Sequence, residues 1–268
     1  MASTVHDGVP RGEVEHRYGP RVHLLENPFL STVLGRISGP DTKLTEVVGL
    51  LRLAYELLLA EAIRELPTVD VELPTRMAQQ HGAAGHWRGP VIDPATRVVL
   101  CDVIRGGIVP SQVCFERLLA VLPDSALRLD HLNMSRVAGP DGRVAGVDLS
   151  GSKIGGSVEG VTLMIPDPMG ATGSTLLRAV QHYREHHGEP ARILALSMII
   201  TPEFLRNVLS ELPELVVYAG RVDRGLSDPE VLESVPGTYW DRERGLDDHS
   251  YIVPGAGGVG EVLNNSWC

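Results

Sequence analysis

Apolar runs rich in β-branched residues alternate with segments of helical spacing from residue 98 onward. The strand candidates cover residues 98–104, 161–165, 193–200 and 215–219. The helix candidates between and after them cover residues 111–121, 174–187 and 202–212. A parallel strand needs a crossover connection, usually a helix, to return the chain beside its neighbour. The alternation therefore predicts an α/β fold, a mostly parallel sheet flanked by helices.

A long helical pattern precedes this alternation. Asp41 and Thr42 are candidate N-caps for a helix that runs to about Leu66. Residues 69–73 have the pattern of a short strand, and residues 77–88 that of a loop.

The N-terminal stretch differs in composition from the rest. Residues 1–20 are polar, charged and contain glycine, as is typical of a mobile tail. A chain of 268 residues is long enough for one large domain. We therefore expect a tail over residues 1–20 and a single domain over residues 21–268.

Composition and charge exclude several classes of protein. The formal net charge of −10 argues against binding nucleic acid through a broad basic face. No apolar stretch reaches the roughly 18 residues of a membrane span, so no membrane partner is expected. Cys101, Cys114 and Cys268 are too scattered for a disulfide framework or a zinc site. A reducing cytoplasm is the setting these features favour.

The junction over residues 163–175 carries the clearest chemical signal. An apolar strand ends at Asp167, a turn of small residues follows, and a helical pattern begins near Ser174. The first amides of a helix lack internal partners and its dipole favours negative charge, so the turn is suited to a phosphate. It lacks a Walker-A lysine and a dinucleotide-binding glycine pattern. The alternative is an ordinary strand-to-helix turn.

Two further segments contain glycines next to groups that could meet a ligand. Arg105 is followed by Gly106 and Gly107 at a strand end, an arrangement suited to a pyrophosphate. Taken alone, an arginine in such a place is more often a solvated surface residue. Residues 251–260 hold four glycines, which permit close backbone approach to a flat ligand, or simply form a flexible C-terminal loop.

Taken together, the three segments resemble the uracil phosphoribosyltransferase family. The resemblance rests on the order Arg-Gly-Gly, Asp-Pro-Met-Gly-Ala-Thr-Gly-Ser-Thr and Gly-Leu-Asp-Asp-His-Ser-Tyr-Ile-Val-Pro-Gly. It extends over about residues 22–265. It implies a type I phosphoribosyltransferase fold, with a small hood built from N- and C-terminal segments, and commonly a homo-oligomer, dimer or tetramer.

The resemblance also implies roles for individual residues. Asp167 and Arg105 would be catalytic, with Asp167 facing the ribose hydroxyls of phosphoribosyl pyrophosphate (PRPP) and Arg105 on its pyrophosphate. The implied PRPP-binding residues are Arg105, Arg136, Asp167, Pro168, Met169, Gly170, Ala171, Thr172, Gly173, Ser174 and Thr175. The implied base-binding residues are Ile252, Gly257, Gly258 and Val259. Lys153 falls where the family has a lysine at the end of its flexible loop.

The implied reaction is transfer of phosphoribose from PRPP to uracil, giving UMP and diphosphate, with Mg²⁺ held mainly by PRPP. Residues 138–159, rich in Gly and Ser, would form a lid over the site. The alternatives are transfer to a different base or heterocycle, and a non-catalytic nucleotide-sensing regulator on the same scaffold. A sugar-phosphate binder of unrelated fold would require the three-part match to be chance.

This chain departs from the family on the base side. Gly258 stands where the family usually has an acid, and Glu261 replaces the next aspartate. The irregular segment over residues 226–245 supplies most of some twenty extra residues before the base-binding segment. These departures favour altered base specificity with PRPP chemistry retained.

Overall fold

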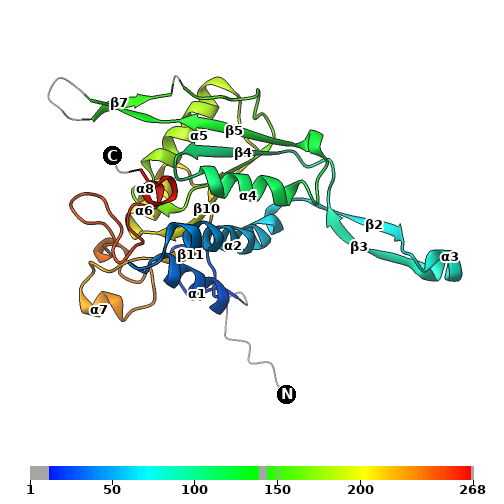
Figure 1. The fold of residues 1–268 in the computed structure, drawn as a ribbon, viewed down its shortest axis with the longest axis horizontal. Coiled ribbons are helices and arrows are strands. Elements are labelled where there is room, and N and C mark those ends of the chain that lie inside the picture. The colour runs from blue at the N-terminus through cyan, green and yellow to red at the C-terminus, as the bar shows by residue number, and fades with distance from the viewer. Residues whose placement is uncertain (1–11, 139–143, 150, 267–268) are drawn as a thin grey trace, which may run out of the picture.

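Seven strands form the central sheet of the computed structural model, which describes residues 12–138, 144–149 and 151–266 (Figure 1). The strand order is β1-β11-β10-β8-β4-β5, with β9 also on β10, and each neighbouring pair is parallel. The strands are β1 (Val22–Leu24), β4 (Val98–Ile104), β5 (Leu127–Asn133), β8 (Thr162–Pro166), β9 (Met169–Gly170), β10 (Arg192–Ile200) and β11 (Val216–Val222). The expected parallel α/β fold is confirmed.

Helices cover both faces of the sheet. One face packs on α1 (Pro28–Ile37), α2 (Leu44–Ala62) and α4 (Ile108–Leu118). The other packs on α5 (Ser174–His186) and α6 (Pro202–Glu211). Because both faces are covered, the central strands β4, β8 and β10 read as continuous apolar runs. The same property made them predictable.

Helix α1 begins where an asparagine and a proline occur together. The Asn27 Oδ1 accepts hydrogen bonds from the backbone N–H groups of Phe29 and Leu30, at 2.9 and 3.3 Å. Pro28 occupies the first helical position, where its missing N–H costs nothing. The expected cap of the next helix is wrong, because α2 begins at Leu44 with Lys43 as its N-cap, and Thr42 Oγ1 donates to the Arg36 carbonyl instead.

Two antiparallel hairpins occupy segments expected to be mainly loops, although the short strand expected over residues 69–73 is confirmed within β2. Strands β2 (Thr68–Pro74) and β3 (His86–Ile92) form an arm that extends from the body, with α3 (Ala78–His81) at its tip (Figure 1). The loop expected over residues 77–88 is therefore wrong over residues 86–88, which belong to β3. Strands β6 (Ser135–Ala138) and β7 (Val144–Asp148) form the second hairpin, where a structureless lid was expected.

Segments from the two ends of the chain pack together beside the sheet. The Tyr18 hydroxyl donates to Glu243 Oε2 at 2.6 Å, and the Tyr18 ring meets Trp240 edge-on. The Arg17 N–H donates to the Pro236 carbonyl at 2.7 Å. Residues 12–18 of the expected tail thus belong to this packed region, which corresponds to the expected hood; residues 1–11 lie outside the described part.

The C-terminal region is mostly irregular, as its sequence suggested. It contains the short helices α7 (Pro229–Leu232) and α8 (Val259–Asn264).

The remaining helical segments of the described chain are short. Single 3₁₀ turns occur at Ile63–Glu65, Gly82–Gly85, Asp124–Ala126 and Trp240–Arg242. Within the described ranges, no helix is both long and apolar enough to cross a bilayer.

Candidate functional site

The turn between β8 and α5 presents an uncapped helix start at the carboxyl end of the sheet. Gly173 is the N-cap of α5, adopts a left-handed conformation with φ of 78°, and has no side chain that could cap the helix. The Ser174 N–H, at the start of α5, donates a long hydrogen bond of 3.4 Å to Thr172 Oγ1. The Thr172 and Ser174 hydroxyls lie 2.8 Å apart, and the side chains of Ser174 and Thr175 are exposed. Backbone N–H groups and hydroxyls thus converge on one small volume, as an anion requires.

Helix α6 holds this turn in place. The Thr201 hydroxyl donates to the Ala171 carbonyl at 2.7 Å, and the Asn207 amide donates to the Thr172 carbonyl at 2.8 Å. A Cβ added at Gly173 would lie 2.5 Å from Val208 Cγ1. The turn is therefore clamped against a packed helix and is preorganised for its ligand.

Asp167 lies between β8 and this turn, with its backbone N–H bound to the Leu196 carbonyl at 3.0 Å. Its side chain is partly buried. Burial raises the pKa of the Asp167 carboxyl to about 6, and the nearby Asp102 carboxylate adds to the rise, while the Met169 backbone N–H opposes it. At neutral pH the group is ionised, but only a small change in its surroundings is needed to protonate it.

The Arg105–Gly107 turn is adjacent to Asp167. A Cβ added at Gly106 would lie 3.5 Å from Asp167 Oδ1. Arg105 follows a cis peptide bond from Ile104, and its Nη1 donates to the Ser266 hydroxyl at 2.9 Å. The predicted pyrophosphate arginine and the predicted ribose acid thus belong to one site.

The C-terminal segment closes the site from a third side. A Cβ added at Gly260 would lie 3.8 Å from the Gly106 nitrogen, so the start of α8 packs on the arginine turn. Ile252 is buried, and the backbone N–H of Gly255 donates to Asp223 Oδ2 at 2.8 Å. Gly257 is exposed with a φ of 67°, which favours glycine there.

Glu261 compensates sterically for the glycine at position 258. A Cβ added at Gly258 would collide with the Glu261 Oε2. The Glu261 carboxylate therefore fills the volume that a side chain at position 258 would take. An acidic group is present at this place in spite of the glycine.

The described part of the chain does not bring every predicted residue into this site. Arg136 lies on β6, and its side chain is outside what the structure describes. Lys153 is exposed, and its backbone pairs with His131 through hydrogen bonds of 2.9 and 2.7 Å.

Sequence reasoning missed two residues under the arginine turn. Asp102 Oδ2 lies 2.6 Å from His131 Nδ1 on the neighbouring strand, and Asp102 is 1% exposed. The signal was an acid inside the otherwise apolar run over residues 98–104. Buried acids need partners and rarely occur without a reason.

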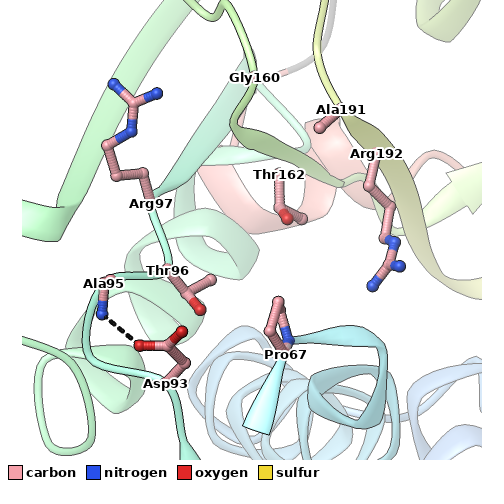
Figure 2. Close-up of a pocket in the computed structure, with 9 residues that line it drawn as sticks. All are labelled: Pro67, Asp93, Ala95, Thr96, Arg97, Gly160, Thr162, Ala191 and Arg192. Atoms are coloured by element: carbon pink, nitrogen blue, oxygen red, sulfur yellow. Dashed lines mark hydrogen bonds between the residues drawn. The ribbon is translucent and has the colours of Figure 1, made fainter. Parts of the chain in front are cut away.

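A separate cavity opens at the amino ends of the same strands, away from this site (Figure 2). Figure 2 shows the Arg97 guanidinium pointing away from the cavity. None of the predicted site residues lines this cavity. Its lining residues are Pro67, Asp93, Ala95, Thr96, Arg97, Gly160, Thr162, Ala191 and Arg192. The predicted chemistry therefore belongs to the carboxyl edge, where ligands bind in parallel α/β sheets.

Comparison with known proteins agrees with this geometry. The model of the family described as uracil phosphoribosyltransferase matches residues 24–242. The uracil phosphoribosyltransferase of Variovorax paradoxus (strain S110) is 25% identical over 242 residues, which cover 90% of this chain and 97% of the relative. The enzyme of the same name from Pyrobaculum islandicum is 26% identical over 242 residues, with the same coverage.

A solved structure shares the fold. The AQ2163 protein from Aquifex aeolicus superposes with a TM-score of 0.66 at 21% identity, over 90% of this chain and 97% of that one. The family match includes the arginine turn and the phosphate turn, which the structure brings together with the C-terminal segment. The chain therefore belongs to the uracil phosphoribosyltransferase family and is a phosphoribosyltransferase.

Proposed function

We propose that the protein transfers phosphoribose from PRPP to uracil, giving UMP and diphosphate with Mg²⁺. The observation that carries the proposal is the convergence of three segments at one edge of the sheet: the phosphate turn, the arginine turn and the start of α8. Each suits one part of the reactants. Membership of the family and the names of its relatives support uracil as the acceptor.

PRPP would lie along the carboxyl ends of β8 and β4. Its 5′-phosphate would bind residues 171–175, where the Gly173 N-cap offers no side chain to the start of α5. The Asp167 carboxylate would face the ribose hydroxyls, flanked by Pro168, Met169 and Gly170. Arg105 would bind the pyrophosphate, with Arg136 of the β6–β7 hairpin as the second arginine.

The reaction is driven by charge stabilisation. Breaking the bond between C1 of the ribose and the pyrophosphate leaves positive charge on the sugar and negative charge on the leaving group. Arg105 would stabilise the leaving group, and the Asp167 carboxylate would stabilise the sugar, with both charges fixed before the reaction begins. Excluding water from the cationic sugar prevents hydrolysis, a role that suits the β6–β7 hairpin.

Mg²⁺ fits this scheme as an ion carried by the substrate. It prefers oxygen ligands, which the pyrophosphate and ribose of PRPP provide. In the described ranges, no three His, Cys, Asp or Glu side chains converge as a metal site. The ion would neutralise charge on the leaving group, and its removal with EDTA should abolish turnover, restored by excess Mg²⁺.

The base would bind against the C-terminal segment. Ile252, Gly257, Gly258 and Val259 would read its edge, mostly through backbone groups. The Glu261 carboxylate over Gly258 supports retention of an acid beside the base. Because that acid comes from a different position than in the family, the shape of the base site is the part most open to change.

We also propose a homo-oligomer in the cytoplasm. The β2–β3 arm exposes Val69, Leu73 and Trp87, apolar side chains that a second copy would cover. The buried free thiols of Cys101 and Cys114 suit a reducing compartment. Light scattering of the purified protein should give a mass that is a multiple of the chain mass. A monomeric mass would contradict this assembly.

A panel of bases tests the proposed reaction directly. The purified protein would be incubated with PRPP, Mg²⁺ and each of uracil, cytosine, thymine and hypoxanthine, and diphosphate and nucleotide would be measured. UMP formation with uracil is the expected result. Turnover of another base but not of uracil would identify that base as the acceptor and contradict the proposal. PRPP binding in calorimetry without turnover of any base would indicate a nucleotide-sensing regulator.

A further inference from the structure

A buried acid lies directly under the arginine turn. Asp102 is 1% exposed, and a Cβ added at Gly107 would lie 3.0 Å from its Oδ1. That oxygen is buried and has no hydrogen-bond partner among the described residues. The carboxylate therefore faces the backbone of the turn that would hold the pyrophosphate.

Asp102 and Asp167 flank consecutive residues of the same turn. Asp167 Oδ1 is the near neighbour of Gly106, and Asp102 Oδ1 is the near neighbour of Gly107. Two carboxylates in one partly dry region oppose each other's ionisation. A turn meant to bind an anionic leaving group would also be weakened by an uncompensated negative charge beneath it.

His131 can compensate this charge. It lies opposite Asp102 in the β4–β5 register, and its Nδ1 is 2.6 Å from Asp102 Oδ2. Its side chain is 47% exposed and reaches solvent, while that of Asp102 is 1% exposed. An imidazole ring can carry the positive charge that offsets a carboxylate.

We propose that Asp102 and His131 are positioning residues for phosphoribosyl transfer. The imidazolium neutralises the Asp102 carboxylate under the Arg105–Gly107 turn, and this keeps Asp167 ionised beside the ribose. The inference rests on the proposed role of Asp167. It assigns to His131 and Asp102 an effect on the reaction that acts through Asp167 and the turn.

The other ionisable groups around the pair leave this balance intact. Burial raises the pKa values of the Cys101 and Cys114 thiols and of the Tyr55 hydroxyl well above their usual ranges, so these groups are neutral. Asp130 lies on the opposite face of β5, where Arg128 binds it through two hydrogen bonds of 2.9 and 3.0 Å. Among the described side chains, Asp167 lies at the neighbouring glycine of the turn, and Lys153 is joined to His131 by its backbone.

Two conservative variants should shift the pH dependence of the reaction in opposite directions. Asp102→Asn removes a negative charge near Asp167, so Asp167 should stay ionised to lower pH. His131→Gln keeps a hydrogen-bond donor to Asp102 but removes the positive charge, so Asp167 should protonate at higher pH. We expect the acidic limb of kcat/KM for PRPP to shift by about half a pH unit each way, about threefold in rate on that limb.

His186→Gln is the matched control, because His186 lies exposed at the end of α5, away from the pair. Its pH profile should match that of the unchanged enzyme. If both Asp102→Asn and His131→Gln merely lower the rate at every pH, without opposite shifts, the pair is only structural and the inference is overturned.

A second readout separates this inference from the proposed function. In substrate-free protein with ¹³C-labelled aspartate, NMR titration follows the Asp167 carboxyl directly. Opposite shifts of its midpoint in the two variants support the pair even if no base is turned over. Turnover of uracil with an unmoved Asp167 midpoint in both variants supports the proposed reaction and contradicts the pair.

Discussion

At the scale of single residues, Asp167 shows that the site is built at the expense of stability. Its carboxyl is partly buried, and its pKa is raised to about 6 by burial first and by Asp102 second. The folded state therefore prefers the neutral form more than the unfolded chain does. The ionised form, which the reaction would need, destabilises the folded state above pH 6.

Asp167→Asn should therefore stabilise the protein while inactivating it. Turnover should fall at least about a hundredfold, because the charge beside the sugar is lost. The gap between about 6 and the ordinary 3.8 sets an upper limit of about 3 kcal/mol for the gain in free energy of unfolding at pH 8. The gain should shrink as pH falls through 6 and vanish below 4. Urea unfolding of both proteins at pH 8 and below pH 4 would measure this. A variant less stable at pH 8 would contradict this account.

The position of Asp167 beside the turn before α5 could be predicted from its sequence context, but its surroundings could not. An acid after an apolar run and before a small-residue turn is a local pattern. The approach of Asp102 and His131 depends on the pairing of β4 with β5. Residues 127–133, at the sheet edge, mix polar and apolar side chains, so that strand does not read as a buried run.

At the scale of elements, the phosphate turn depends on glycine for both conformation and packing. Gly173→Ala would introduce a Cβ 2.5 Å from Val208 Cγ1 at a φ of 78°. We expect a loss of about 1–3 kcal/mol in free energy of unfolding and a higher KM for PRPP, because the turn must move off α6.

Gly35→Ala is the control for this change. Gly35 lies inside α1, and a Cβ there would meet no atom within 4 Å. This variant should gain about 0.5–1 kcal/mol, since alanine favours a helix interior, and should leave KM unchanged. Urea unfolding and steady-state kinetics of both variants provide the test. Equal effects at the two positions would show that the turn is not the cause.

The predictability of each element follows its burial. Strands β8 and β10 are buried on both faces, and their predicted ends differ by a residue at most. The β6–β7 hairpin was missed because glycine and serine hide its alternation, and β1 because three residues are too few to show any. The Asn27-Pro28 pair was a usable signal for α1.

At the scale of the whole molecule, one buried carboxylate joins the two ends of the chain. Glu243 is 0% exposed and accepts hydrogen bonds from the Tyr18 hydroxyl at 2.6 Å, the Arg224 Nη1 at 2.8 Å and the Gly237 N–H at 2.7 Å. Arg224 is itself buried. Removing Glu243 would leave this guanidinium buried without its partner charge.

Glu243→Ala should lower the free energy of unfolding by about 3–5 kcal/mol, because a broken buried ion pair leaves an uncompensated charge. Glu243→Gln, which keeps a hydrogen-bond acceptor, should lose less. Glu233→Ala, at an exposed position in the same region, should change stability by about 0.5 kcal/mol or less. Thermal and urea unfolding of the three variants would decide; a Glu243→Ala variant as stable as Glu233→Ala would contradict the ion-pair argument.

Strand β1 has a consequence for synthesis on the ribosome. It is made before the other strands of the sheet, yet it pairs with β11, which begins only at Val216. The Tyr18 hydroxyl likewise can form its hydrogen bond only after Glu243 has been made. A nascent chain can assemble β4, β5, β8 and β10 in the order of their appearance, while β1 stays unpaired until β11 has been made. This strand is therefore made before the rest of the sheet and is among the last parts of it to pair.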